Sequence, residues 1–394
     1  MHEWDPASIR GRNVVFFNWR DTANPEGGGS ERYVETMARG LVEHGAHVTI
    51  FCAAHEAAPS DQVVDGVRYV RRGNHLDVYL LGVWSLLRRR FGRVDIVVDV
   101  QNGLPFFTRL GTHKPVVVLV HHVHREQWPV VFPGMLGKVG WWIERRLAPL
   151  LYRRCQYIAV SRATRTELMQ LGVDKERIAV VHNGTARPPA VDAVKTVCPS
   201  LVVVSRLVPH KQIEHAVDAV AAIRDTHPDV SLTIVGSGWW EDDLRKHAAD
   251  AGIGDLVSFE GYVTEARKHE LLAESWLMLL PSIKEGWGLV VGEAAMHGTP
   301  TVAYRAAGGT RESIDHGVSG LLADSYEEVV DALADVLGDH DVRSRLARGA
   351  RSHSGRFTWG HSQAAFAHVV DASLRGRLVA RQDEVGEDQL LEEP

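Results

Sequence analysis

Short apolar runs rich in Val and Ile alternate along the chain with longer segments in which apolar residues recur at helical spacing. Such runs between amphipathic helices are typical of parallel strands that are buried on both faces. In the first half, the pattern predicts a helix over 30–45 and strands at 14–18, 47–52, 94–100, 115–120 and 156–160. We therefore expect one doubly wound α/β domain here.

A second series of strands and helices follows the segment TARPPAVDAVKTVCPS, which contains prolines and lacks apolar periodicity. This loss of periodicity predicts a linker over 187–199. Beyond it, the expected strands lie at 201–205, 231–236, 256–261, 276–281 and 300–304, and the expected helices at 211–225, 241–251, 265–274 and 290–297. The second half therefore predicts another Rossmann-like domain.

These elements predict an α/β protein of two Rossmann-like, doubly wound domains, the first over 1–186 and the second over 200–356. A helix at 357–378 is expected to cross back to the N-terminal domain, and the acidic tail at 379–394 is expected to be disordered. Open α/β sheets bind ligands at the carboxyl ends of their strands. We therefore expect the two domains to face each other across a cleft, with the informative residues in strand-to-helix loops.

The composition is that of a folded globular protein. The 394 residues are 45% hydrophobic and 24% charged, and a net charge of −6 argues against a nucleic-acid-binding protein. The charge is uneven, because residues 1–194 carry 25 basic and 19 acidic side chains, whereas residues 195–394 carry 19 and 31. The first half is therefore the candidate for contact with an anionic surface.

Three isolated cysteines, Cys52, Cys155 and Cys198, lack the spacing of a disulfide framework or a zinc site. The N-terminus lacks an apolar signal segment, and no stretch approaches the roughly 18 apolar residues that span a bilayer. We therefore expect a cytoplasmic protein, with peripheral contact at the inner face of the membrane as the only membrane contact.

A glycine-rich loop, Gly27-Gly28-Gly29, follows the first strand and precedes a helix, with Ser30 as the expected N-cap. Backbone N–H groups in such a loop can approach a phosphate, and an ordinary flexible turn is the alternative interpretation. The loop does not follow GxGxxG, and the second strand ends without the acidic residue that would hold an NAD ribose. Both features argue against a dinucleotide-dependent oxidoreductase.

The expected loops of the second domain carry charges of both signs. Arg206 and Lys211 lie between a strand and a helix, where two cations suit a diphosphate, although solvated cations are common at such positions. Glu285 lies in a glycine-rich loop after a strand, and Glu293 follows eight residues later. Carboxylates accept hydrogen bonds from vicinal hydroxyl groups, so a sugar or a ribose is the ligand that such a pair would hold.

The segment PSIKEGWGLVVGEAAMHGTP, which contains both glutamates, closely resembles the E-x7-E region of the retaining family-4 glycosyltransferases of the GT-B fold. Other motifs agree in order and spacing: the glycines at 27–29, HH at 121–122, VS at 160–161, HNG at 182–184, SRLVPHK at 205–211, IVGSG at 234–238, FEGYV at 259–263 and AGGTRE at 307–312. The resemblance covers about residues 13–375. HNG departs from the usual PNG, and Arg311 replaces the proline of GGxPE, which puts the shape of that loop in question.

The resemblance implies roles for individual residues. Arg206 and Lys211 would bind the donor diphosphate and stabilise its departure. Glu293 would hold the ribose hydroxyls, and Glu285 the donor sugar. His121 matches the family's active-site histidine, although a histidine after a strand is more often structural. The other implied donor-binding residues are Gly28, Gly29, Gly236, Tyr262, Gly286, Trp287, Gly288 and Leu289.

Family-4 enzymes resemble one another in needing no metal, so neither a metal nor another cofactor is expected. The DxD sequence Asp339-His340-Asp341 lies between two helical patterns and is expected to cap a helix. The implied reaction passes through an oxocarbenium-like state with retention, and the leaving diphosphate accepts the acceptor's proton.

The implied enzyme is a hexosyltransferase that uses a nucleotide sugar of the GDP-mannose, UDP-glucose or UDP-N-acetylglucosamine type. Its acceptor would be a glycan, a glycolipid or a small molecule in envelope or polysaccharide biosynthesis. The alternatives are a sugar-nucleotide epimerase of the same fold and an inactive carbohydrate-binding paralogue.

Aromatic and basic residues are interleaved over 128–154. The aromatic residues are Trp128, Phe132, Trp141, Trp142 and Tyr152, and the basic residues are Arg145, Arg146, Arg153 and Arg154. This mixture suits peripheral contact with a membrane or a lipid-phosphate acceptor. A helix that packs its aromatic face on the core and exposes its arginines is the alternative.

Overall fold

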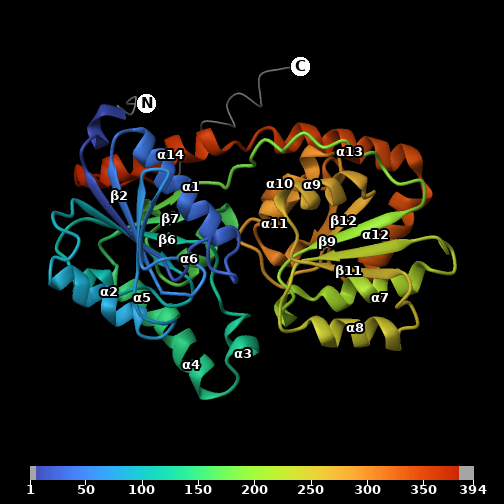
Figure 1. The fold of residues 1–394 in the computed structure, drawn as a ribbon, viewed down its shortest axis with the longest axis horizontal. Coiled ribbons are helices and arrows are strands. Elements are labelled where there is room, and N and C mark those ends of the chain that lie inside the picture. The colour runs from blue at the N-terminus through green and yellow to red at the C-terminus, as the bar shows by residue number, and fades with distance from the viewer. Residues whose placement is uncertain (1–5, 381–394) are drawn as a thin grey trace. The chain divides into compact units, whose positions relative to one another are not determined.

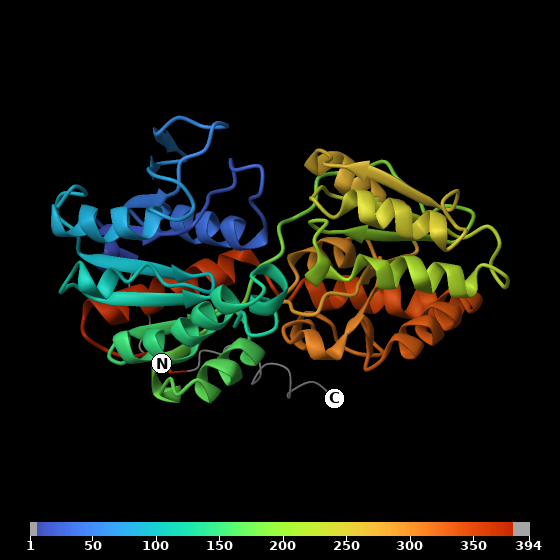
Figure 2. The ribbon, with the colours of Figure 1, turned by 90° about the horizontal axis from the view of Figure 1, so that it is seen from below.

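The computed structural model describes residues 6–380 and forms two compact units. Unit 1 combines the chain up to Asn183 with the segment from Trp359 onward, and unit 2 comprises Gly184–Thr358. Each unit contains one largely parallel sheet flanked by helices (Figures 1 and 2). The tail expected to be disordered lies, from residue 381 onward, outside the described residues.

The sheet of unit 1 has eight strands in the order β3-β4-β2-β1-β5-β6-β7-β8, and every neighbouring pair is parallel except β3 and β4. Its strands are β1 Asn13–Phe17, β2 His47–Cys52, β3 Asp61–Val64, β4 Val67–Arg71, β5 Ile96–Gln101, β6 Val116–Val120, β7 Gln156–Ala159 and β8 Ile178–Val180. The strand order reverses between β1 and β5, and open sheets bind ligands at such a reversal.

The helices of unit 1 include the last helix of the described chain. They are α1 Gly29–Glu43, α2 Val78–Leu87, α3 Trp128–Val131, α4 Met135–Trp142, α5 Ala148–Leu151, α6 Arg162–Gln170 and α14 Trp359–Leu374. Phe366 of α14 stacks on Phe16 of β1, with ring centroids 5.8 Å apart, and both rings are fully buried. Residues of α14 therefore belong to the hydrophobic core of unit 1. Burying one such ring contributes about 1.5–3 kcal/mol to the free energy of folding.

The apolar pattern does not predict the β3–β4 hairpin. Most residues of β3 are exposed, so the strand lacks the buried run that identifies the other strands. Its two-residue turn has Asp65 and Gly66 at φ +50° and +77°. Asp-Gly between two β-forming segments is a strong hairpin signal, and this signal could have located both strands.

Unit 2 contains a six-stranded, fully parallel sheet in the order β11-β10-β9-β12-β13-β14. Its strands are β9 Ser200–Val204, β10 Ser231–Val235, β11 Val257–Gly261, β12 Leu277–Leu280, β13 Thr301–Tyr304 and β14 Gly320–Ala323. Its helices are α7 Ile213–Ile223, α8 Glu241–Asp250, α9 Glu265–Glu274, α10 Leu289–Met296, α11 Thr310–Ser313, α12 Tyr326–Gly338 and α13 His340–Ser354. The strand order reverses between β9 and β12.

Residues 121–156 form several short elements rather than one packed helix. Helices α3 and α4 project from the body of unit 1 (Figure 1), and a π-helical turn, Ile143–Leu147, joins α4 to α5. The buried carboxylate of Glu144 in this turn accepts hydrogen bonds from Trp128 Nε1 at 2.7 Å and from the His124 backbone N–H at 3.1 Å. No helix among residues 6–380 is long and apolar enough to cross a bilayer.

Candidate functional site

The charged residues predicted in the second half lie at the strand reversal of unit 2. Arg206 follows β9 and is exposed, and Lys211 ends a short 3-10 helix, Pro209–Lys211, after the same strand. Glu285 lies in the loop between β12 and α10. Because β9 and β12 are neighbours in the sheet, their carboxyl ends bring these loops together at the edge where open sheets bind ligands.

Lys211 and Glu285 form an ion pair with 2.5 Å between Nζ and Oε1. Only 16% of the lysine side chain and 12% of the glutamate side chain are exposed. The backbone also joins the two loops, because the Ile283 N–H donates to the His210 carbonyl at 3.1 Å. The structure therefore brings together a cation and a carboxylate that are 74 residues apart in sequence.

The AGGTRE segment supports the loop that carries Glu285. The Glu285 N–H donates to the Ala307 carbonyl at 2.8 Å, and the Gly309 N–H donates to the Glu285 carbonyl at 3.0 Å. A Cβ at Gly309 would lie 2.0 Å from the Gly286 carbonyl oxygen, so only glycine allows this approach. Arg311, which replaces the expected proline, keeps its N–H and donates it to the Gly308 carbonyl at 3.2 Å.

The residues after Glu285 lead into α10, whose first residue is Leu289. Gly288 has φ +82° at the N-cap position, a conformation that glycine adopts without strain. The Trp287 side chain is buried and packs edge to face on Phe357, with ring centroids 4.8 Å apart. The indole ring of Trp287 is therefore part of the packing of unit 2, and Gly286 beside it is also buried.

Glu293 lies in the second turn of α10 and is paired with a residue that the sequence did not single out. Its Oε2 is 3.0 Å from Nζ of Lys268 in α9, and the two side chains are only 10% and 12% exposed. A lone lysine inside a helix belongs to none of the motifs. Only the packing of α9 beside α10 shows this pair.

Gly236 and Tyr262 lie after the two strands on the other side of β9. Gly236 has φ +126°, and a Cβ there would lie 1.9 Å from the Ser205 carbonyl oxygen. Gly236 therefore allows the loop after β10 to pack on the backbone next to Arg206. Tyr262 is 85% exposed in the loop between β11 and α9.

The other predicted residues lie in unit 1, at the start of α1 and at the end of β6. Ser30 does not cap α1, contrary to expectation: Gly28 is the N-cap residue, and its N–H donates to Oε2 of Glu31 at 2.7 Å. Gly29 is the first residue of the helix. The carboxylate of Glu31, the third residue of the helix, thus accepts the N–H of the N-cap residue, which is the glutamate half of a capping box.

His121 follows β6 and packs edge to face on Tyr33 of α1, with ring centroids 5.4 Å apart. This contact places His121 beneath the first turns of the helix that begins at Gly29. Burial, and to a lesser degree the neighbouring His124, lowers the pKa of His121 to about 3. The imidazole is therefore neutral near pH 7, so it can form a hydrogen bond to a ligand but supplies no charge.

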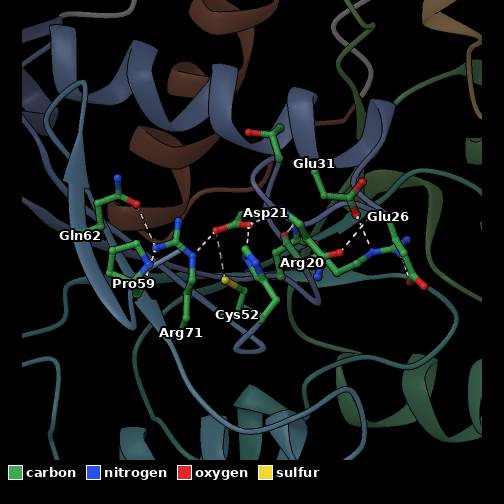
Figure 3. Close-up of polar contacts among 12 residues, drawn as sticks. Arg20, Asp21, Glu26, Glu31, Cys52, Pro59, Gln62 and Arg71 are labelled. Atoms are coloured by element: carbon green, nitrogen blue, oxygen red, sulfur yellow. Dashed lines mark hydrogen bonds and ion pairs between the residues drawn. The ribbon is translucent and has the colours of Figure 1, made fainter. Parts of the chain in front are cut away.

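Ion pairs of the buried Asp21 carboxylate and of Arg20 hold the loop between β1 and α1 (Figure 3). Asp21 accepts a hydrogen bond from Arg71 Nε at 2.5 Å, and His55 Nε2 lies 2.9 Å from its other oxygen. Arg20 pairs with Glu26 at 2.8 Å. Because the Asp21 and Arg71 side chains are at most 2% exposed, this network fixes the path of the glycine-rich loop.

The DxD sequence is a helix cap, as expected. Asp339 is the N-cap of α13, and its Oδ1 accepts hydrogen bonds from the backbone N–H groups of Asp341 at 2.8 Å and Val342 at 3.1 Å. Within residues 6–380, no group of three or more His, Cys, Asp or Glu side chains is arranged to hold a metal ion.

Comparisons with known proteins agree with this architecture. Residues 27–186 match the family Glycosyltransferase Family 4, and residues 195–353 match the family Glycosyl transferases group 1. A D-inositol 3-phosphate glycosyltransferase of Acidothermus cellulolyticus is 35% identical over 399 residues, which cover 90% of this chain and 88% of that protein.

Solved structures share the fold over nearly the whole chain. Sucrose-phosphate synthase of Thermosynechococcus elongatus has a TM-score of 0.79 at 18% identity and covers 93% of this chain and 100% of its own. Anabaena HepE, solved in complex with UDP-glucose, has a TM-score of 0.73 at 19% identity and covers 91% of this chain and 99% of its own. The chain therefore belongs to family 4 of the glycosyltransferases and is a hexosyltransferase with the GT-B fold.

Proposed function

We propose that this enzyme transfers a hexose, with retention of anomeric configuration, from a nucleotide sugar of the GDP-mannose, UDP-glucose or UDP-N-acetylglucosamine type. The acceptor is a hydroxyl group of a glycan, a glycolipid or a small molecule in envelope or polysaccharide biosynthesis. The observation that carries the proposal is the Lys211–Glu285 pair at the strand reversal of unit 2. The neighbour HepE, solved with UDP-glucose, supports the class of donor.

In the proposed reaction, the bond from the sugar C1 to the diphosphate oxygen breaks, and the acceptor oxygen forms its bond to C1 on the same face. The acceptor's proton passes to the departing diphosphate. Lys211 and Arg206 stabilise the charge that develops on this leaving group, which is the task of a metal ion in other transferases. Glu285 holds the sugar, Glu293 holds the ribose, and neutral His121 donates or accepts a hydrogen bond. We therefore propose that no metal is required.

The test supplies candidate donors with and without an acceptor and measures release of the nucleoside diphosphate, in buffer with and without EDTA. We expect release that depends on the acceptor and is unchanged by EDTA. An epimerase would convert the donor without an acceptor, and an inactive paralogue would bind the nucleotide and release nothing. An absolute requirement for Mn²⁺ would contradict the metal-independent mechanism.

We further propose peripheral membrane contact within 128–154, through the projecting tip of α3 and α4 at residues 130–142 (the α3–α4 tip). Its exposed apolar side chains, each 42–72% exposed, are Val130, Val131, Phe132, Met135, Leu136, Val139 and Trp142. Two aromatic residues of the segment point elsewhere: Trp128 is bonded to Glu144, and Tyr152 is fully buried and bonded to Asp99. Exposed apolar side chains gathered in one short projecting segment are typical of an interaction site.

The charges around the α3–α4 tip favour an anionic bilayer as its partner. Over residues 125–146, Arg125, Lys138, Arg145 and Arg146 are exposed, whereas of the two acidic residues Glu126 is exposed and Glu144 is buried. Each basic residue near an anionic surface contributes about 1 kcal/mol to binding. A second copy of the chain that docked through the same tip would bring basic residues against basic residues.

Cosedimentation with phosphatidylglycerol and phosphatidylcholine vesicles tests this contact. We expect the wild type to pellet with the anionic vesicles at low salt, and less at physiological salt, because salt screens the attraction. The Met135→Ser, Leu136→Ser variant and the Arg145, Arg146, Arg153, Arg154→Gln variant should both lose binding, while Val197→Ser, a change at a residue 94% exposed in unit 2, should not. Wild type that stays in the supernatant, or that self-associates through the α3–α4 tip, would refute the proposal.

A further inference from the structure

Lys268 in α9 lies between two carboxylates of very different exposure. Its Nζ is 3.0 Å from both oxygens of Glu265, one helical turn earlier, and 3.0 Å from Oε2 of Glu293 in α10. The Glu265 side chain is 63% exposed, whereas those of Lys268 and Glu293 are 12% and 10% exposed. The two ion pairs are therefore matched in distance but not in environment.

The difference in exposure decides which pair restricts a side chain. An ion pair between two residues one helical turn apart is screened by water when one of them is exposed, and it contributes little to the free energy of folding. A nearly buried carboxylate is shielded from water, so an ammonium at 3.0 Å acts on its rotamer and on the direction in which its oxygens point. The pair also joins α9 to α10, and the loop of Glu285 leads directly into α10.

We propose that Lys268 is a positioning residue that orients the Glu293 carboxylate toward the ribose hydroxyls of the nucleotide. This inference rests on the proposed function, in which Glu293 holds the ribose. Lys268 contacts no reacting atom, and it acts on the affinity for the nucleotide through Glu293. Because each hydroxyl donates to a charged acceptor, a carboxylate turned away from the ribose loses a hydrogen bond that only a ribonucleotide can make.

The experiment compares ribonucleotides with their deoxy analogues. Thermal-shift titrations and calorimetry are carried out on the full chain with UDP and GDP and with their 2′-deoxy and 3′-deoxy counterparts. Wild type should bind its preferred nucleoside diphosphate about tenfold to a hundredfold more tightly than the analogue that lacks the contacted hydroxyl, as expected for a charge-assisted hydrogen bond. In Lys268→Met, this preference should fall to within about threefold, through weaker binding of the ribonucleotide alone.

Matched variants separate positioning from other roles. Glu265→Gln, which removes only the exposed partner, should keep the wild-type preference, and Lys268→Arg should restore part of it. Glu293→Gln should lose the preference, and adding Lys268→Met to it should cause no further loss. If Lys268→Met alone folds poorly, the Glu293→Gln, Lys268→Met double variant can still be compared with Glu293→Gln, because it buries no unpaired carboxylate at position 293.

Equal weakening of the ribose and deoxyribose forms would mean that Lys268 binds the phosphates or serves only the fold, and would overturn the inference. An unchanged preference in Lys268→Met would overturn it as well. If no nucleoside diphosphate bound the wild type at all, the proposed function itself would fail, and this outcome is distinct from both.

Discussion

Replacing Lys211 or Arg206 by alanine is expected to lower kcat by about two to three orders of magnitude, because each removes a preorganised charge that faces the anion formed on the leaving diphosphate. Folding should survive, because Arg206 is exposed and Lys211 is the last residue of a three-residue 3-10 helix outside the cores of the two units. The measurement is kcat at saturating donor, with circular dichroism as the check on folding. Lys246→Ala, a change at an exposed cation of α8, is the control and should leave kcat unchanged.

The ion pair with Glu285 adds a distinction between the two variants. Lys211→Ala leaves the Glu285 carboxylate without the ammonium that lies 2.5 Å away, whereas Arg206→Ala leaves that pair intact. Lys211→Ala should therefore also raise KM for the donor, since the carboxylate then lies unpaired beside the bound diphosphate. Near wild-type turnover in either variant would remove that residue from the leaving-group role.

Replacing Arg71 by methionine is expected to destabilise unit 1 by about 3–5 kcal/mol, because it leaves the fully buried carboxylate of Asp21 without its cation. Arg71 also donates to the Pro59 carbonyl at 2.7 Å and to Gln62 at 3.2 Å, so these acceptors lose a donor as well (Figure 3). The measurement is the free energy of unfolding from urea titrations monitored by circular dichroism.

The neighbouring residue provides a matched control. Arg72 pairs with Asp61, and these side chains are 40% and 45% exposed, so Arg72→Met should cost less than about 1 kcal/mol. The Asp21→Leu, Arg71→Met double variant should be more stable than Arg71→Met alone, because it buries no unpaired charge. Equal destabilisation by Arg71→Met and Arg72→Met would contradict the role assigned to this buried pair.

Elements with a strong apolar period were predicted closely from the sequence. The strand expected at 47–52 is β2, His47–Cys52, and the helix expected at 265–274 is α9, Glu265–Glu274. Four of the six residues of β2 are buried, and the buried residues of α9 lie within 269–273, so the local sequence carries the information. The same reasoning missed β3, whose exposed residues leave no apolar run, although its Asp-Gly turn was visible.

The cap of α1 shows the limit of local rules. A serine before an apolar helical pattern predicts an N-cap, and Ser30 satisfied that rule. The structure places the N-cap two residues earlier, at Gly28, because Glu31 accepts the Gly28 N–H and is itself buried 3.8 Å from Arg20. A contact with the loop after β1 therefore decided the cap.

Periodicity and motif spacing are local properties of the chain, and they were enough to predict the fold class, the two series of strands and helices, and the segments that carry Arg206, Lys211, Glu285 and Glu293. Which of these side chains meet depends instead on the tertiary structure. Lys211 pairs with Glu285 because the strand order reverses between β9 and β12, and Glu293 pairs with Lys268 because α9 packs beside α10. Both pairs join segments far apart in the chain, and their distance depends on the order of the strands and the packing of the helices, which no local pattern encodes.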